Sequence, residues 1–370
     1  MTPIRVLHLD SERTWRGGER QVLELMRRQR TRGDAPVLLA PASGALFSRA
    51  AAEGIPAEDV AMRGTWDLAS VLRIAQITRA ARPHVVHWHA ARAHALGAMA
   101  AVLSPGPKRV LSRRVDFPVR GSWGSRLLYS LPIEAIAAIS VGVKDALVRS
   151  GVPESRIQVI PSGVDLAPFD APFDREAARR ALGVGPGTIL AVQVAALAPH
   201  KSQATLLQAA ALLGDRCPTL RIWIAGEGEL LETLRSEHAA LKLGERVRFL
   251  GFTSDVVTLL RASDLFVLSS YLEGLGTSIV DAMAASLPVV ATRVGGIPEL
   301  VRHGETGLLV PPRDAGALAE ALLALAGDPE RRATMGARGR VLSREFSADR
   351  TEASTRALYE HLLGEAPGCP

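Results

Sequence analysis

The sequence predicts an α/β protein built from two doubly wound domains in tandem. Short apolar runs typical of buried parallel strands alternate with helix patterns, once before residue 161 and again after residue 188. A stretch punctuated by Pro and Gly, residues 161–172, separates the two series and is the predicted linker. The 370 residues are 47% hydrophobic, so each domain can bury a core of its own.

The first domain opens with a predicted strand at residues 4–9. The amphipathic helix pattern that follows, 19–32, places Val22 and Met26 on its apolar side and is stopped by Gly33. The further strands expected here are 35–40, 85–89, 110–112, 135–140 and 157–160, and the further helices are 68–82 and 91–103.

The second domain repeats the alternation. Its expected strands are 189–194, 220–225, 247–250, 265–268 and 288–292, and its expected helices are 201–213, 230–243, 256–261 and 277–285. A helical region, 315–363, closes the chain, with breaks near 327–329 and 345–347. In parallel sheets of this kind, ligands bind beyond the carboxyl ends of the strands, so the loops at those ends are the places to look for chemistry.

Composition narrows the function classes. The net charge of +6 indicates attraction to anions such as nucleotide phosphates or an anionic lipid surface, although an Arg-rich coding bias explains it equally well. No nucleic-acid-binding signature accompanies the charge. Cys217 and Cys369 form no metal or redox motif, and neither a signal peptide nor a transmembrane stretch is expected. We expect a cytoplasmic protein, with peripheral contact to an anionic membrane as an option.

The most informative segment is Glu273-Gly-Leu-Gly-Thr-Ser-Ile-Val-Asp281, which follows the predicted strand 265–268. A glycine loop lets the backbone approach a ligand, and the helix N-terminus after it offers free N–H groups and positive partial charge. The two acids do not bind phosphate, so they are expected to bind hydroxyl groups of the same ligand.

These motifs resemble those of the retaining glycosyltransferases of family 4, which have the GT-B fold. The matching motifs are Gly17-Gly-Glu19, the strand that ends at His89, Ser140-Val-Gly-Val143, Val159-Ile-Pro-Ser-Gly-Val-Asp165, the segment at Lys201, Ala225-Gly-Glu-Gly228, Val247-Arg-Phe-Leu-Gly251, Ser263-Asp264, the Glu273 loop, Gly295-Gly-Ile-Pro-Glu299 and Gly304-Glu-Thr-Gly-Leu-Leu-Val310. Each alone is weak, but their common order along the chain is specific.

The resemblance implies two Rossmann-like domains that face each other across a cleft. Residues 1–168 would form the acceptor-side domain and residues 169–345 the nucleotide-sugar-binding domain. Residues 346–370 would form a helix that returns to the first domain, followed by the tail.

By this resemblance, Glu273 approaches the transferred sugar and Asp281 binds the ribose hydroxyls, where the family usually has the longer Glu. Alternatively, Glu273 merely ends a strand and Asp281 is a solvated helix residue. Backbone N–H groups of the loop would hold the sugar or the diphosphate. The remaining residues that the resemblance places at the donor and nucleotide are Gly274, Leu275, Gly276, Thr277, Gly226 and Phe249.

Lys201 corresponds to a family lysine that neutralises the diphosphate leaving group. The family has an Arg five residues earlier, where this chain has Ala196. Loss of a guanidinium removes bidentate recognition of phosphate, for which His200 or Arg293 are candidate replacements. A solvated lysine at a helix start is the alternative for Lys201.

In the first domain, the resemblance places Gly17 and Gly18 at the donor phosphate and His89 at the transferred sugar. His87 is a second candidate, and a buried structural role is the alternative for each histidine. The density of histidines raises the idea of a metal cluster, yet no Cys or carboxylate completes a ligand set, so we expect no protein-bound metal.

A basic and aromatic segment after residue 112 is the expected acceptor side, facing an anionic lipid or glycan; an ordinary Arg-rich surface is the alternative. Its candidate residues are Arg113, Arg114, Phe117 and Trp123.

The function expected is transfer of a sugar from a nucleotide-diphosphate sugar, with UDP favoured over GDP, to a hydroxyl of a glycan or lipid-linked acceptor in cell-envelope, lipopolysaccharide or glycolipid synthesis. No permanently bound cofactor, essential metal or nucleic-acid partner is expected. The alternatives are a sugar-nucleotide epimerase or hydrolase on the same scaffold and a nucleotide-sugar-binding protein without turnover. A nicotinamide-dependent oxidoreductase is disfavoured because the Gly-x-Gly-x-x-Gly fingerprint is missing.

Overall fold

The computed structural model describes residues 2–115, 128, 129, 131 and 133–364. The chain forms two compact units, divided between Gly163 and Val164 and again between Ser347 and Ala348. The first unit therefore contains the chain up to Gly163 and the chain after Ser347, and the second contains what lies between. Within the second unit, Val164 donates its N–H to the carbonyl of Phe346 at 3.0 Å and bridges Ser347, which joins the start of this unit to its end.

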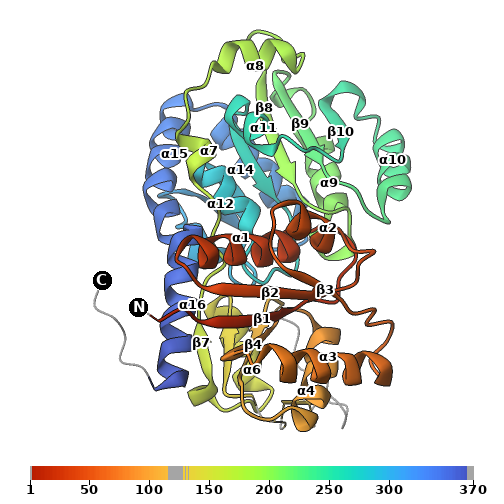
Figure 1. Ribbon diagram of the computed structural model, residues 1–370. Helices are drawn as coiled ribbons and strands as arrows, with labels where there is room; N and C mark the ends of the chain where they lie inside the picture. The colour runs from red at the N-terminus through yellow and green to blue at the C-terminus, as the bar shows by residue number, and fades with distance from the viewer. Residues whose placement is uncertain (1, 116–127, 130, 132, 365–370) are drawn as a thin grey trace. The chain divides into compact units, whose positions relative to one another are not determined.

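The described part of the first unit contains a seven-stranded parallel sheet in the order β3-β2-β1-β4-β5-β6-β7. Figure 1 labels β1, β2, β3, β4 and β7 of this sheet. The strands are β1 (Arg5–Leu9), β2 (Ala35–Ala40), β3 (Ala57–Asp59), β4 (Val85–Trp88), β5 (Lys108–Arg113), β6 (Ala135–Ala138) and β7 (Ile157–Val159). The sequence did not predict β3, since this three-residue edge strand is largely exposed and has no apolar run.

The helices of the first unit lie between its strands in sequence, except for the last one. They are α1 (Gly17–Thr31), α2 (Ala45–Ala52), α3 (Leu68–Ala81), α4 (Ala91–Leu103), α6 (Val141–Arg149) and α16 (Ala348–Leu363), with a 3-10 turn, η1 (Glu154–Arg156). The short helices α2 and α6 were not predicted, because their length leaves too few turns for an apolar period to show.

The second unit contains a six-stranded parallel sheet in the order β10-β9-β8-β11-β12-β13. Figure 1 labels β8, β9 and β10 of this sheet. Its strands are β8 (Ile189–Val194), β9 (Leu220–Ala225), β10 (Val247–Gly251), β11 (Leu265–Leu268), β12 (Val289–Thr292) and β13 (Gly307–Val310). The central strands β11 and β12 are buried along their whole length, as their unbroken apolar runs indicate. The predicted α/β class with doubly wound parallel sheets is thus confirmed.

Helices cover this second sheet, and one of them starts later than the sequence predicted. They are α7 (Ala167–Asp170), α8 (Arg175–Ala181), α9 (Gln203–Leu213), α10 (Leu231–Ala240), α11 (Val256–Ala262), α12 (Thr277–Ala284), α13 (Ile297–Leu300), α14 (Ala315–Ala326) and α15 (Pro329–Ser343), with 3-10 turns η2 (Pro199–Lys201), η3 (Gly214–Arg216), η4 (Gly244–Arg246) and η5 (Arg344–Phe346). The predicted helix at 201–213 starts at Gln203, because Ser202 has a φ of 50° and separates η2 from α9. No helix in the described ranges is both long and apolar enough to cross a bilayer.

Helix α16 belongs to the first unit and packs beside α1 (Figure 1). Its Tyr359 is fully buried in a cluster with Ile4, which precedes β1, and with Val6 and Val85 of the sheet. Its Arg356 reaches the turn after α1, where Nη1 donates to both carboxylate oxygens of Asp34 at 2.6 and 2.8 Å. The C-terminal segment therefore completes the hydrophobic and polar interior of the unit that contains the N-terminus.

Asp34 and Arg356 each make a further hydrogen bond besides the one between them. Asp34 also accepts the N–H of Ile4 at 2.9 Å, and Arg356 Nε donates to Glu360 at 2.8 Å. Both members of the pair are buried. A buried pair with these additional hydrogen bonds contributes little net energy when intact, but loss of one partner leaves a buried charge uncompensated.

We expect Arg356→Met to lower the free energy of unfolding of the first unit by about 3–5 kcal/mol, because the buried carboxyl group of Asp34 would lose its partner. Hydrogen exchange at the amides of β1 and β2 measures this loss in the first unit alone. Arg79→Met, at an exposed position on α3 of the same unit, is the matched control. If the amides of β1 and β2 were equally protected from exchange in the two variants, the assignment of α16 as a structural part of this unit would be contradicted.

Candidate functional site

The predicted donor residues lie in loops at the carboxyl edge of the second sheet. Strands β8 and β11 are neighbours in this sheet, so the loop after β8, which contains Lys201, meets the loop after β11, which contains Glu273. The Lys201 ammonium forms an ion pair with the Glu273 carboxylate, and Ser270 Oγ donates to the same carboxylate oxygen at 3.2 Å. Their side chains are only 16% and 13% exposed. The structure thus places next to each other two candidates that are 72 positions apart.

The backbone that presents Lys201 is anchored to the neighbouring loop. Ser269 Oγ donates to the carbonyl of Lys201 at 3.0 Å, and the buried Gln193 amide donates to Ser269 Oγ at 3.1 Å. The N–H of Tyr271 donates to the carbonyl of His200 at 2.9 Å. These bonds fix the 3-10 turn that contains Lys201 against the loop that leads to Glu273.

Gly226, in the loop after β9, allows the closest backbone approach at this edge. Its φ is 144°, and a Cβ at this position would lie 2.0 Å from the carbonyl oxygen of Ala195. Its N–H donates to the carbonyl of Gly251 at 2.8 Å. Only glycine fits here, so the loops after β8, β9 and β10 pack backbone against backbone.

The segment from Gly274 to Thr277 turns from β11 into α12. Gly276 has a φ of 90° and is the N-cap of α12, and none of the described side chains caps this N-terminus. Leu275 is buried, which holds the turn against the core. The first N–H groups of α12 are thus without a side-chain acceptor from the described protein, as at helix N-termini that bind anions.

The two departures from the family pattern have different surroundings. Asp281 lies in α12 and is only 3% exposed, so it is not a solvated helix residue. The carbonyl of Ala196 accepts from the Gln203 side chain at 2.9 Å, which uses this backbone to hold the start of α9. Arg293, one candidate to replace the missing guanidinium, is exposed.

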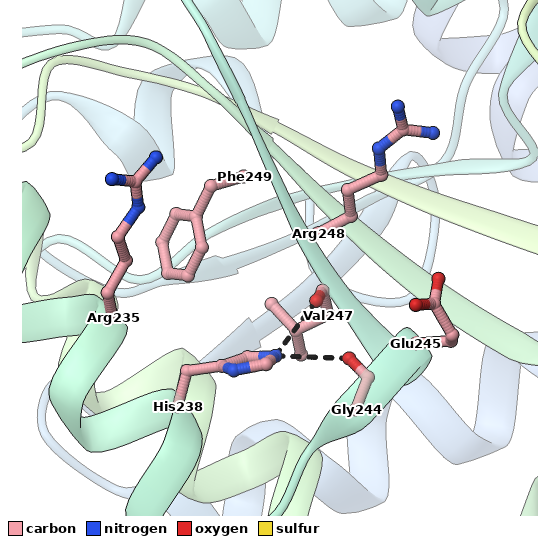
Figure 2. Close-up of a pocket in the computed structure, with 7 residues that line it drawn as sticks. All are labelled: Arg235, His238, Gly244, Glu245, Val247, Arg248 and Phe249. Atoms are coloured by element: carbon pink, nitrogen blue, oxygen red, sulfur yellow. Dashed lines mark hydrogen bonds between the residues drawn. The ribbon is translucent and has the colours of Figure 1, made fainter.

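Phe249 lies on the edge strand β10, and its ring faces α10. Figure 2 shows it beside His238 and Arg235 at a shallow pocket, and its ring centroid is 6.0 Å from that of His238. His238 Nε2 lies 3.1 and 3.0 Å from the carbonyls of Gly244 and Val247, so this histidine holds the turn before β10 (Figure 2). Phe249 is therefore packed between helix and strand, and its contact with the nucleotide stays a prediction.

In the first unit, Gly17 and Gly18 form the start of α1. The N–H of Arg16 donates to Glu19 Oε2 at 2.7 Å, which closes the N-terminus of the helix. A Cβ on Gly18 would lie 3.8 Å from Cδ of Arg114. The glycine turn therefore lies directly against the residue that follows β5.

Three histidines meet on one face of the first sheet. His8 of β1 and His87 of β4 are register partners, and His89 follows on the same face. His8 Nδ1 lies 2.9 Å from His89 Nε2, and His8 Nε2 lies 2.8 Å from Gln29 Oε1 of α1. Burial lowers the pKa of His8 to about 4 and lowers the pKa values of His87 and His89 well below their usual range. The cluster is therefore neutral at physiological pH.

Both ring nitrogens of His87 are also occupied. Nδ1 lies 2.6 Å from the hydroxyl of Tyr359, and Nε2 lies 2.8 Å from Ser112 Oγ. His8, His87 and His89 each offer a nitrogen within 4.8 Å of the others, so these are the residues that could hold a metal ion in the described part of the chain. A metal would have to replace hydrogen bonds already made and would lie near the Arg114 guanidinium, which is 3.2 Å from His89.

Arg114 follows β5, and Arg113 is the last residue of that strand. Arg114 donates to His89 Nδ1 at 3.2 Å and to Ser162 Oγ at 3.4 Å. Burial raises the pKa of Asp10, which directly follows β1, to about 7, and Glu19 raises it further whereas Arg114 lowers it. Phe117 and Trp123 lie outside the described residues.

The sequence analysis did not select Asp10, Gln29, Ser162 or Tyr359. The sequence did contain one signal for Asp10. In His8-Leu-Asp10 and in His87-Trp-His89, polar residues alternate with an apolar one at the ends of strands β1 and β4. Residues two positions apart in a strand lie on the same face of the sheet. Tyr359 carries no such signal, because it comes from a helix 272 positions away from His87.

Comparisons with known proteins identify both halves of the chain. Residues 15–168 match the family model described as Glycosyltransferase Family 4, and residues 174–342 match the one described as Glycosyl transferases group 1. The two segments contain Lys201, Glu273 and His89, whereas His8, Asp10 and Tyr359 lie outside them.

Curated relatives are similar over part of their length. The putative glycosyltransferase EpsD of Bacillus subtilis is 33% identical over 230 residues, which are 61% of this chain and 60% of that protein. A D-inositol 3-phosphate glycosyltransferase of Pseudarthrobacter chlorophenolicus is 34% identical over 257 residues, which are 68% of this chain and 61% of that protein. The matched segments thus span about three fifths of the length of these relatives.

Among solved structures, Anabaena Alr3699/HepE in complex with UDP has a TM-score of 0.85 at 23% identity and covers 97% of this chain and 100% of that chain. A likeness at this identity shows the fold. The predicted GT-B type, with two Rossmann-like sheets in one chain, is confirmed by it.

The depressed pKa of His8 predicts a pH-dependent contribution to stability. Below pH 6.5 the unfolded chain protonates this side chain whereas the folded protein does not until about pH 4, so the contribution is present above pH 6.5 and is lost as the pH falls towards 4. Relative to His8→Gln, the wild type should therefore lose about 3 kcal/mol between pH 7 and pH 4.

Hydrogen exchange at the amides of β1 over this pH range measures the difference. Asp10 acts in the opposite sense, since its raised pKa favours the folded state as the pH falls below 7, but it is present in both proteins. If the free energy of unfolding changes with pH in the same way in the wild type and the variant, His8 is not held neutral by burial.

Proposed function

Because this chain belongs to the glycosyltransferases with the GT-B fold, with a family 4 domain followed by a group 1 domain, we propose that it transfers a sugar from a nucleotide-diphosphate sugar to an acceptor hydroxyl, with retention of the anomeric configuration. The observation that supports this most directly is the placement of Lys201 beside Glu273 at the glycine-rich start of α12. This place combines a cation for the diphosphate, which is Lys201, with a carboxylate that can accept hydrogen bonds from sugar hydroxyls, which is Glu273. It also offers backbone N–H groups at the start of α12.

In the proposed reaction, Lys201 stabilises the charge that develops on the leaving diphosphate, and Glu273 accepts hydrogen bonds from the sugar hydroxyls. Without donor, the two side chains neutralise each other. When the donor binds, Lys201 would pair with the diphosphate and Glu273 with the sugar hydroxyls. Neither charge would therefore be buried without a partner, with or without the donor. The acceptor oxygen attacks on the face that the diphosphate leaves, and the departing phosphate takes its proton.

We further propose UDP as the nucleotide, Asp281 as the ribose ligand, and a hydroxyl of a glycan or lipid-linked acceptor in cell-envelope synthesis as the second substrate. Support for UDP comes from the similar structure that contains it. Support for a hydroxyl-rich acceptor comes from the relatives named for D-inositol 3-phosphate. The positive net charge supports a location at the inner face of an anionic membrane.

A panel of UDP-, GDP- and ADP-sugars tests the donor assignment by thermal stabilisation. At about 100 times the dissociation constant, a ligand adds about 2.7 kcal/mol to stability, so the correct donor should raise the unfolding midpoint by about 5 °C or more. UDP-glucose is expected to be effective and ADP-glucose is not. If no nucleotide sugar in the panel stabilises the protein, the donor site is wrongly assigned.

Glu273→Gln should lower kcat by about 10²-fold or more, with little change in the unfolding midpoint, because the carboxylate is needed at the sugar and Gln preserves its size. UDP release from UDP-glucose in the presence and absence of acceptor measures this and also separates a transferase from an epimerase or hydrolase. The control is Glu330→Gln at an exposed position on α15, which should behave as wild type. Wild-type turnover in the Glu273 variant would refute the role proposed for this carboxylate.

A further inference from the structure

Arg313 lies in the loop after β13, in a backbone conformation that favours glycine. Its φ is 61°, in the left-handed region where an L side chain is sterically disfavoured. It lies between Pro312, whose ring fixes its own φ, and Asp314, whose carboxylate accepts the N–H of Ala317 at 2.8 Å and caps α14. A strained backbone at a position where glycine would have no strain indicates that the side chain has a role.

The guanidinium of Arg313 stacks on the ring of Tyr271. Its Cζ lies 4.1 Å from the ring centroid, well within the distance at which a cation is attracted to an aromatic face. Tyr271 lies in the loop after β11, and β12 separates that strand from β13 in the sheet. The contact therefore joins two loops at the carboxyl edge whose strands are not neighbours.

Tyr271 belongs to segment 270–273, which ends in the Glu273 carboxylate that pairs with Lys201. Three hydrogen bonds from other loops hold this segment. They join the N–H of Tyr271 to the carbonyl of His200 at 2.9 Å, Thr292 Oγ1 to the carbonyl of Ser270, and the N–H of Gly296 to the carbonyl of Glu273 at 3.3 Å. The loops after β8 and β12 thus fix the backbone of the segment, and Arg313 adds a contact to its side chain from the loop after β13.

The loop that contains Arg313 is anchored by the helix that follows it. Helix α14 begins at Ala315 and buries Leu318, Leu322 and Leu325 in the core of the second unit. Together with Pro312 this anchor limits the movement of the loop. Arg313 is therefore a side chain on a fixed support, and its contact with Tyr271 restrains segment 270–273.

We propose that Arg313 is a positioning residue, which acts through the ring of Tyr271 to hold Glu273 and Lys201 in the arrangement that the reaction requires. This inference rests on the proposed function for the reaction that it serves, but its effect on the loop can be measured without a substrate. A cation–aromatic contact at an exposed site shifts an equilibrium by about two- to fivefold. Its loss should lower the population of the productive arrangement by the same factor.

The first experiment is amide hydrogen exchange of the full-length protein without ligand. The N–H of Tyr271 exchanges when its bond to His200 opens, so Arg313→Gly should speed this exchange by about two- to fivefold. The matched control is Arg82→Gly, because Arg82 is likewise an exposed arginine with a positive φ, 43°, but lies at the end of α3 in the first unit. Wild-type exchange at Tyr271 in Arg313→Gly would overturn the proposal.

The second experiment measures the release of UDP from UDP-glucose at steady state. Arg313→Gly should lower kcat by about two- to fivefold and leave KM unchanged, because the effect lies in the orientation of the site. The unfolding midpoint should not fall, since glycine adopts this backbone conformation without strain. Arg82→Gly should behave as wild type in this assay.

Three results of this assay would contradict the positioning role. A raised KM with unchanged kcat would mean that Arg313 contacts the donor itself, unchanged kcat and KM would exclude it from the reaction, and a lower unfolding midpoint would make its role one of stability. If the wild type releases no UDP, the proposed function fails, and the exchange experiment still decides whether Arg313 holds the loop. The two failures are thus distinguishable.

Variants of Tyr271 test whether Arg313 acts through this ring. Tyr271→Leu should lower kcat as much as Arg313→Gly, and the double variant should lose no more than either. Tyr271→Phe keeps an aromatic face for the guanidinium and should match the wild type. Additive losses in the double variant, or equal losses in the Phe and Leu variants, would show that Tyr271 acts independently of Arg313 and would refute the coupling.

Discussion

The parallel direction of the strands is the constraint on which the functional chemistry of this protein depends. Within each sheet the carboxyl ends of neighbouring strands share one edge, so loops that are distant in sequence meet there. This brings Lys201 to Glu273 in the second unit and Arg114 to His89 in the first. Helices on the faces of the sheets leave these edges as the places where polar side chains can reach a ligand.

The two units hold their charged groups in different ways. In the second unit, Lys201 and Glu273 neutralise each other directly, and the backbone on both sides is tied by Ser269 and its partners. In the first unit, the Arg114 guanidinium is backed by neutral imidazoles whose pKa values are depressed by burial. The ion pair needs no other charge nearby, whereas the imidazoles orient the guanidinium without adding a charge to the interior.

Helix α16 connects these local arrangements to the stability of the first unit. Its Arg356 pairs with the buried carboxylate of Asp34, and its Tyr359 supplies both apolar packing and a hydrogen-bond partner for His87. The final helix is therefore part of the interior that orients the edge of the sheet. Gln29 of α1 is linked to Arg114 by hydrogen bonds through His8 and His89.

The sequence by itself determined the α/β class and most helices and strands, because apolar periodicity and glycine loops are local features that a chain displays in order. It also predicted Lys201 and Glu273 as site residues. Short or exposed elements such as β3 were missed, since they carry too few apolar residues for a period to show. Only the tertiary structure decided that Phe249 faces α10 and that His89 is enclosed by His8 and Arg114. The contacts of a side chain depend on which strands pair and which helix covers them, and partners as far apart as His87 and Tyr359 leave no pattern in the sequence.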